Sequence, residues 1–85
     1  MRELNYTIRD KMGLHARPAS FLVKKAAAFP CRVTVESEGK MVDAKKTFAV
    51  LGLNVKCGQE IILRTDGELE AEAMAELHRF LEENL

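Results

Sequence analysis

The residues with the clearest chemical potential are a histidine and an arginine two positions apart, His15 and Arg17. Pro18 follows directly, and the apolar spacing after it predicts a helix from about residue 16 to residue 28. Proline is tolerated near such a start because the first amides of a helix have no partner within the helix. His15 therefore stands where unpaired amides are expected to point outward.

A histidine at this end of a helix could act as a nucleophile toward phosphorus. The partial positive charge of the helix start disfavours protonation of the ring, so the neutral form is available near neutral pH. The same charge and the free amides attract an anion such as phosphate. Arg17 adds a guanidinium group that fits phosphate oxygens, and Gly13 lets the preceding loop bend so that a partner can approach. By position alone, however, His15 is first interpreted as the N-terminal cap of the helix.

The other residues that could do chemistry offer less. His78 lies on a predicted helix with no second metal ligand four residues on, so we interpret it as a surface residue. Cys31 and Cys57 are far apart and form no C-x-x-C pair, so we expect two reduced thiols that behave as small, partly buried apolar residues. Thiol or metal chemistry through these residues is disfavoured for want of ligand spacing, and the sequence implies neither a metal nor a cofactor.

Length and composition limit the classes of protein that remain. A chain of 85 residues predicts one domain, residues 1–85, with a thin core and no deep cavity. Thirteen basic residues balance thirteen acidic ones, so the charge excess of a nucleic-acid binder is missing. The longest apolar run, residues 48–53, is far shorter than the roughly 20 residues of a membrane span. No secretory signal opens the chain, so we expect a cytoplasmic protein.

The pattern of apolar residues predicts seven short elements. The expected strands cover about residues 2–9, 32–36, 40–43 and 60–64, and the expected helices about residues 16–28, 46–53 and 68–83. A capping box from Thr65 to Glu68 is expected to start the last helix. This order predicts an α+β, two-layer open-faced sandwich (βαββαβα) in which a four-stranded antiparallel sheet carries three helices on one face. The other face is expected to be open to water, since its positions are polar: Glu3, Asn5, Thr7, Thr34 and Glu36.

The segment from Gly13 to Ala19, GLHARPA, resembles the active-site signature of the HPr family, the histidine-containing phosphocarriers of the bacterial phosphoenolpyruvate-dependent phosphotransferase system. The resemblance extends over essentially the whole chain. It includes the Gly39 hairpin, residues 43–45 before the short helix, Gly58 before the fourth strand and the acidic last helix.

The resemblance implies a carrier of phosphoryl groups more than an enzyme in the strict sense. His15 would accept a phosphoryl group on ring Nδ1 from phospho-enzyme I and pass it to enzyme IIA, while Arg17 stabilises the phosphate. The implied docking positions surround His15 and the short second helix, and they are Leu14, Ala16, Arg17, Ser20, Phe48 and Leu51. Either Phe48 or Leu51, more readily Leu51, could instead be a core residue. A rim of Lys24, Lys45 and Lys46 suits an acidic partner. We expect the free protein to be a monomer.

One position departs from the family. Many members from low-GC Gram-positive bacteria carry a regulatory serine where this sequence has Lys46, so the serine-based regulation is in doubt here. Thr47 is rotated by about 100° around the helix and is a poor substitute. Two alternatives therefore stay open beside the carrier of a sugar-uptake system. One is a regulatory protein–protein interaction module, and the other is a specialised relative in a nitrogen-type phosphorelay.

Overall fold

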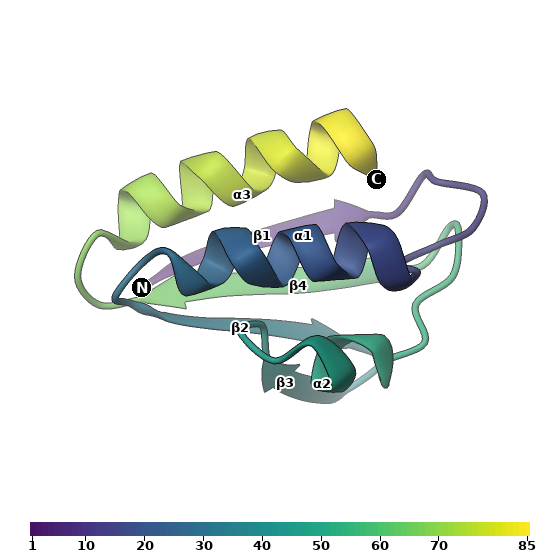
Figure 1. The fold of residues 1–85 in the computed structure, drawn as a ribbon, viewed down its shortest axis with the longest axis horizontal. Coiled ribbons are helices and arrows are strands. Elements are labelled where there is room, and N and C mark those ends of the chain that lie inside the picture. Colours follow the sequence, from purple (N-terminus) through teal and green to yellow (C-terminus); the bar gives the residue numbers. More distant parts are fainter.

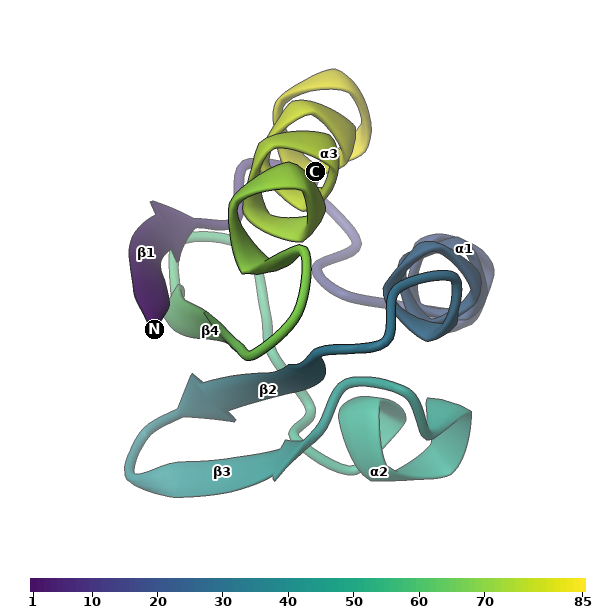
Figure 2. The same cartoon turned by 90° about the vertical axis from the view of Figure 1, so that its left-hand side faces the viewer.

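A computed structural model describes all residues, 1–85, and shows a sheet covered by helices on one face (Figures 1 and 2). The elements in chain order are β1 (Arg2–Thr7), α1 (Ala16–Ala27), β2 (Arg32–Ser37), β3 (Lys40–Asp43), α2 (Thr47–Leu51), β4 (Glu60–Asp66) and α3 (Glu70–Asn84). The strands run in the spatial order β1-β4-β2-β3, and every neighbouring pair is antiparallel. The predicted fold class is thus confirmed.

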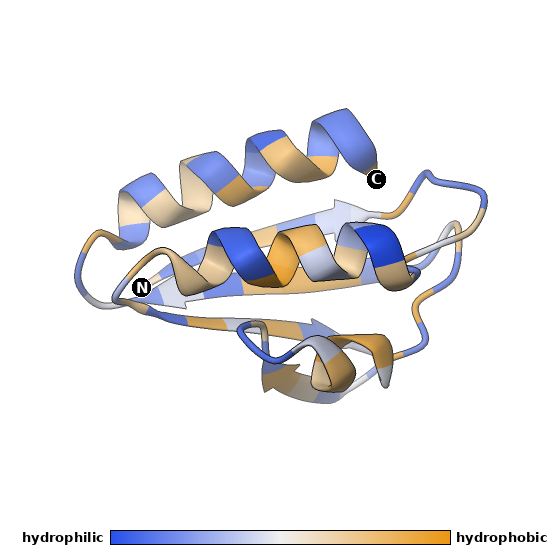
Figure 3. Ribbon diagram, viewed as in Figure 1, coloured by the Kyte–Doolittle hydropathy of each residue, from blue (hydrophilic) through white to orange (hydrophobic).

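The core lies between the sheet and the helices. Alternate strand residues point toward the helices. The register places Leu63 of β4 between Leu4 of β1 and Val35 of β2. Leu22 of α1 and Leu77 of α3 are fully buried against this layer. The apolar residues of α3 lie on its side toward the sheet, and its polar residues lie on the opposite side (Figure 3). The buried residues of α1 are Pro18, Ala19, Leu22 and Ala26. No helix is long and apolar enough to span a membrane.

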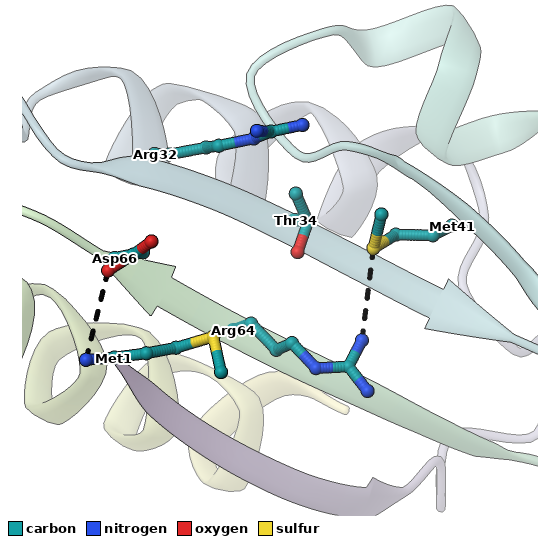
Figure 4. Close-up of a pocket in the computed structure, with 6 residues that line it drawn as sticks. All are labelled: Met1, Arg32, Thr34, Met41, Arg64 and Asp66. Carbon is teal, nitrogen blue, oxygen red and sulfur yellow. Dashed lines mark hydrogen bonds and ion pairs between the residues drawn. The ribbon is translucent and has the colours of Figure 1, made fainter.

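On the face of the sheet without helices, an arginine on β4 forms ion pairs with glutamates on the two neighbouring strands. The Arg64 guanidinium donates to Glu3 Oε2 and to Glu36 Oε1, each at 2.7 Å. These contacts, with Glu36 first, raise the pKa of Arg64 above its ordinary value. Thr34 lies on the same face but is buried, contrary to expectation, because long side chains from neighbouring positions surround it in a shallow depression (Figure 4). The lining residues are Met1, Arg32, Thr34, Met41, Arg64 and Asp66.

The last helix begins differently from the prediction. The capping box of Thr65 and Glu68 does not form, and α3 starts at Glu70 after Leu69, whose backbone is left-handed (φ 63°). Glu70 itself closes the turn by accepting the Gly67 amide (2.9 Å), and the buried Thr65 hydroxyl donates to the Glu70 carbonyl (2.9 Å). The helix therefore starts two positions after Glu68, and no side chain caps it.

An ion pair joins the two long helices across their exposed edges. Lys25 of α1 donates to Glu76 of α3 (3.1 Å), and Arg79 contacts the other oxygen of the same carboxylate. Arg79 first, and Lys25 second, hold the pKa of Glu76 below its ordinary value of 4.5. Because the folded state favours the ionised form, this pair stabilises the fold above about pH 4.5 and ceases to do so as the pH falls through the lower, folded-state value.

We predict that Glu76→Gln lowers stability at neutral pH but not in acid. Urea unfolding between pH 7 and pH 2 should show the largest gap between variant and parent near pH 7, and the gap should close at the acid end. Glu83→Gln, which alters an exposed carboxylate on the same helix with no ion pair, is the control. A gap for Glu76→Gln of equal size at every pH would contradict the assignment.

Candidate functional site

The loop before α1 is fixed by a close contact between two backbones. Gly13 has a left-handed backbone (φ 70°), and a Cβ built there would lie 2.4 Å from the Val55 oxygen. The next amide, that of Leu14, donates to the same oxygen (2.9 Å), and the Leu14 side chain is buried. Glycine is thus required at position 13 by both conformation and space. The loop that leads to His15 is therefore fixed against the backbone at Val55.

His15 occupies the N-cap position of α1. Its backbone is extended (φ −94°, ψ −176°), and its carbonyl accepts the Ala19 amide (3.0 Å), as the first bond of the helix requires. The imidazole, however, makes no capping hydrogen bond, and its side chain is 33% exposed. The backbone of His15 therefore serves as the cap, and the ring is left available for other contacts.

Unused donors lie next to this ring. The amides of Ala16 and Arg17 make no main-chain hydrogen bond, and Pro18 has no amide hydrogen to offer. Arg17 is exposed, and it lines a shallow depression together with His15, Phe21 and Asn84. A helix start, two free amides and a guanidinium group beside a histidine suit an anion such as a phosphoryl group.

One residue of the site was not found from the sequence. Asp10 lines the same depression, and its Oδ2 lies 3.8 Å from His15 Nε2. Its other oxygen, Oδ1, accepts the Met12 amide (2.9 Å), which fixes the carboxylate in the loop. The Asp10 carbonyl accepts the Gly13 amide (2.9 Å), and the Asp10 amide donates to the Leu85 oxygen (3.0 Å). The only signal in the sequence was the position of Asp10 in a predicted turn, where its side chain could accept the amide of Met12 two residues later. Aspartate is common in turns in general, so this position does not indicate a functional site.

The implied docking residues are not all on the surface. Leu14 is 4% exposed, so its side chain offers almost nothing to a partner, because it anchors the loop in the core. Ala16 and Ser20 are exposed on α1. On α2, Phe48 is 88% exposed, whereas Leu51 is half-buried and packs against the core. Phe48 is thus the prominent apolar residue of this face.

The expected basic rim is only partly free. Lys24 and Lys46 are exposed, as a rim requires. Lys45 is half-buried, and its ammonium group donates to the Phe29 carbonyl (2.7 Å), so it contributes to the fold as well.

The remaining chemical candidates lie apart from the site. His78 is partly exposed on α3, where its Nε2 lies 3.5 Å from Glu82, as expected for a surface histidine. Cys31 is buried, but Cys57 is exposed, which corrects the expectation that both thiols are partly buried. The Cys57 thiol contacts the Arg9 carbonyl at 3.6 Å.

Comparison with known proteins points the same way as the geometry. The family described as "PTS HPr component phosphorylation site" matches residues 2–83. A phosphocarrier protein HPr of Lysinibacillus sphaericus is 39% identical over 83 residues, covering 98% of this chain and 94% of the relative. The solved structure of HPr-C-His from Thermoanaerobacter tengcongensis matches with a TM-score of 0.92 and 36% identity, covering 96% of this chain and 92% of the other.

A second kind of relative differs in assembly. The crystal structure of Crh from Bacillus subtilis matches with a TM-score of 0.77 and 36% identity, covering 100% of this chain and 98% of the other. That structure is described as a swapped, intertwined dimer. The monomeric state expected for the present chain therefore stays a prediction.

We predict that Gly13→Ala destabilises the protein more than Gly39→Ala does. Both glycines have a positive φ, which costs a non-glycine residue about 1–3 kcal/mol, but only Gly13 has backbone atoms in the space that a Cβ needs. Urea unfolding of the two variants measures the difference. Equal losses of stability would show that the contact with Val55 has no energetic weight.

Proposed function

The chain belongs to the HPr family of phosphotransferase-system phosphocarriers, and from this premise we propose that His15 is the residue that carries the phosphoryl group. The proposed donor is phospho-enzyme I and the proposed acceptor is an enzyme IIA component. The observation that carries the proposal is the partly exposed imidazole at the N-cap of α1, which makes no capping hydrogen bond beside two unused amides.

The chemistry asked of the chain is simple. The neutral ring attacks phosphorus through the lone pair of Nδ1, the N–P bond forms, and the bond from phosphorus to the donor breaks with its electron pair. The amides of Ala16 and Arg17 and the Arg17 guanidinium then meet the phosphoryl oxygens. An open site is suited to this role because tight binding of the carried group would slow its onward transfer.

The proposed docking face combines α1 and α2, which pack against each other. Phe48 is held out from α2 while Val50 of the same helix is fully buried, so the helix is anchored and the phenyl ring is presented. Exposed Lys24 and Lys46 add positive charge to this region. Such a surface fits a partner with an apolar depression ringed by acidic residues, and association with it should weaken with salt.

A role in binding alone is the second candidate. It is suggested by the Crh relatives, because Crh of Bacillus subtilis is named as a catabolite-repression protein. The HPr-like protein Crh of that organism is 38% identical to this chain over 78 residues. Lys46 also stands at the exposed N-cap of α2, where a regulatory serine would be expected, so phosphorylation of that position is not available to either candidate. The presence of both His15 and Arg17 at an open helix start argues for the carrier.

We predict that incubation with enzyme I and phosphoenolpyruvate adds about 80 Da to the intact protein in an acid-labile form. His15→Ala should abolish the addition, and His78→Ala should leave it unchanged because that ring lies on α3 away from the helix start. Intact-mass spectrometry measures both. Undiminished labelling of His15→Ala would refute the assignment, and partner binding with no labelling of the parent would favour the binding-only role.

We also predict that Phe48→Ala weakens binding to enzyme I or enzyme IIA by about tenfold or more without lowering stability, since buried interface aromatics commonly contribute over 1 kcal/mol. Met41→Ala is the matched control, because Met41 is also an exposed apolar side chain but lies on the uncovered face of the sheet. Calorimetric titration gives the affinities. Equal losses for the two variants would place the docking surface elsewhere.

A further inference from the structure

The carboxylate of Asp10 is placed to act on the histidine ring from the side away from its reactive nitrogen. Oδ2 lies 3.8 Å from His15 Nε2, which is too long for a hydrogen bond but close for an electrostatic contact. The carboxylate is not free to swing away, because Oδ1 accepts the Met12 amide at 2.9 Å. One oxygen thus anchors the side chain, and the other faces the imidazole.

The remaining groups around the ring do not compete for this role. Arg17 is the other charged residue lining the depression, and Pro18, Phe21 and Asn84 are uncharged. The Arg9 guanidinium is occupied by the Tyr6 hydroxyl and the Glu82 carbonyl, each at 2.9 Å. Asp10 thus has the one side-chain carboxylate in the lining of this depression. The main-chain oxygen of the C-terminal residue, Leu85, lies at the main chain of Asp10, where it accepts the Asp10 amide (3.0 Å).

We propose that Asp10 is a positioning residue that keeps the single proton of the neutral His15 ring on Nε2 and so leaves the lone pair on Nδ1. A neutral imidazole carries its proton on either nitrogen, and the neighbour of each nitrogen decides between them. A fixed negative charge near Nε2 favours the tautomer with the N–H at that position. This inference rests on the proposed function, since it explains how the ring is prepared for phosphorus.

The same charge assists the transfer in both directions. When Nδ1 attacks, the bond from phosphorus to the donor breaks, the proton stays on Nε2, and the ring becomes a cation that Asp10 balances. When the group moves on, the electron pair of the Nδ1–P bond returns to Nδ1 and the ring leaves as neutral imidazole, because Nε2 still holds its proton. Loss of that proton would leave an anionic ring, which is a poorer leaving group. Asp10 therefore extends the pH range of transfer upward.

The test is Asp10→Asn, which removes the charge while its amide oxygen can still accept the Met12 amide. Asp43→Asn is the matched control, because Asp43 Oδ1 accepts the Lys45 amide at the same 2.9 Å in another turn, outside the His15 depression. Asp10→Ser is a second neutral variant whose hydroxyl can accept the same amide. The Met12 amide resonance reports whether the loop is preserved in each variant.

The first measurement needs no phosphorylation. The ¹⁵N chemical shifts of the imidazole give the ratio of the two tautomers in the neutral ring. Removal of the Asp10 charge should lower the ratio of the Nε2–H to the Nδ1–H form by about twofold. This is less than the roughly fivefold factor for two unit charges about 4 Å apart in water, because the neutral ring presents only a dipole to the carboxylate. Asp43→Asn should leave it unchanged. An unaltered ratio in both neutral variants of Asp10 with the loop preserved would overturn the inference.

The second measurement uses protein phosphorylated by enzyme I and follows loss of the phosphoryl group to water over a range of pH. The decline in rate toward high pH should move down by about 0.5–1 pH unit in Asp10→Asn and stay in place in Asp43→Asn. A decline at the same pH in all three proteins would contradict the role in transfer. A parent that is not labelled would refute His15 as the carrier, whereas the tautomer ratio would still decide the role of Asp10.

Discussion

The site depends on the contact between Gly13 and the backbone at Val55. The left-handed glycine lets the two chains approach, and the Leu14 amide then bonds to the Val55 oxygen while its side chain enters the core. The same two loops are joined a second time, where Gly58 N–H donates to the Ile8 carbonyl at 2.8 Å. With the loop tied at both ends, His15 arrives at the start of α1 in one orientation, and its ring need not take part in holding the helix. The backbone of His15 thus starts the helix, and its ring stays available for the chemistry that we propose.

A chain of this length has no room for a deep cavity, and His15, the residue that we propose to be reactive, lies in a shallow depression instead. Most of its large apolar side chains are used in a single layer between sheet and helices, and the depression that holds the histidine and its neighbours lies at one end of α1. An enzyme that must exclude water would be poorly served by this arrangement. A carrier that offers the same nitrogen to two partners in turn needs an open approach, and each partner can exclude water when it docks. Small size and exposed chemistry are therefore compatible features of one design.

The fold was predictable because the spacing of apolar residues and the positions of proline and glycine define its helices and strands. The details of the site are instead set by contacts between distant parts of the chain. Alternation placed β1 and β2, and Pro18 and the apolar spacing placed α1 within a residue of its observed end. The predicted start of α3 was wrong, because the left-handed Leu69 delays the helix to Glu70, whose carboxylate accepts the Gly67 amide of the preceding turn. No local rule ranks that solution above a capping box. Leu14 was assigned to the surface because its burial depends on Val55, forty-one positions later. Asp10 was missed because an aspartate in a turn is unremarkable until the fold brings His15 beside it.

Lys46 shows how such local conflicts point to function. It occupies the N-cap of α2, where serine, threonine, aspartate or asparagine would bond to a free amide and where a positive charge meets the positive end of a helix. Lysine offers neither benefit, and no side-chain cap is formed. The five-residue helix persists because Val50 is fully buried and its amide bonds to the Lys46 carbonyl (3.1 Å). Since helix stability does not explain a lysine here, its exposed charge near Phe48 is better explained by the acidic partner proposed for this face. Lys46 thus contributes a permanent positive charge beside the exposed phenyl ring of Phe48.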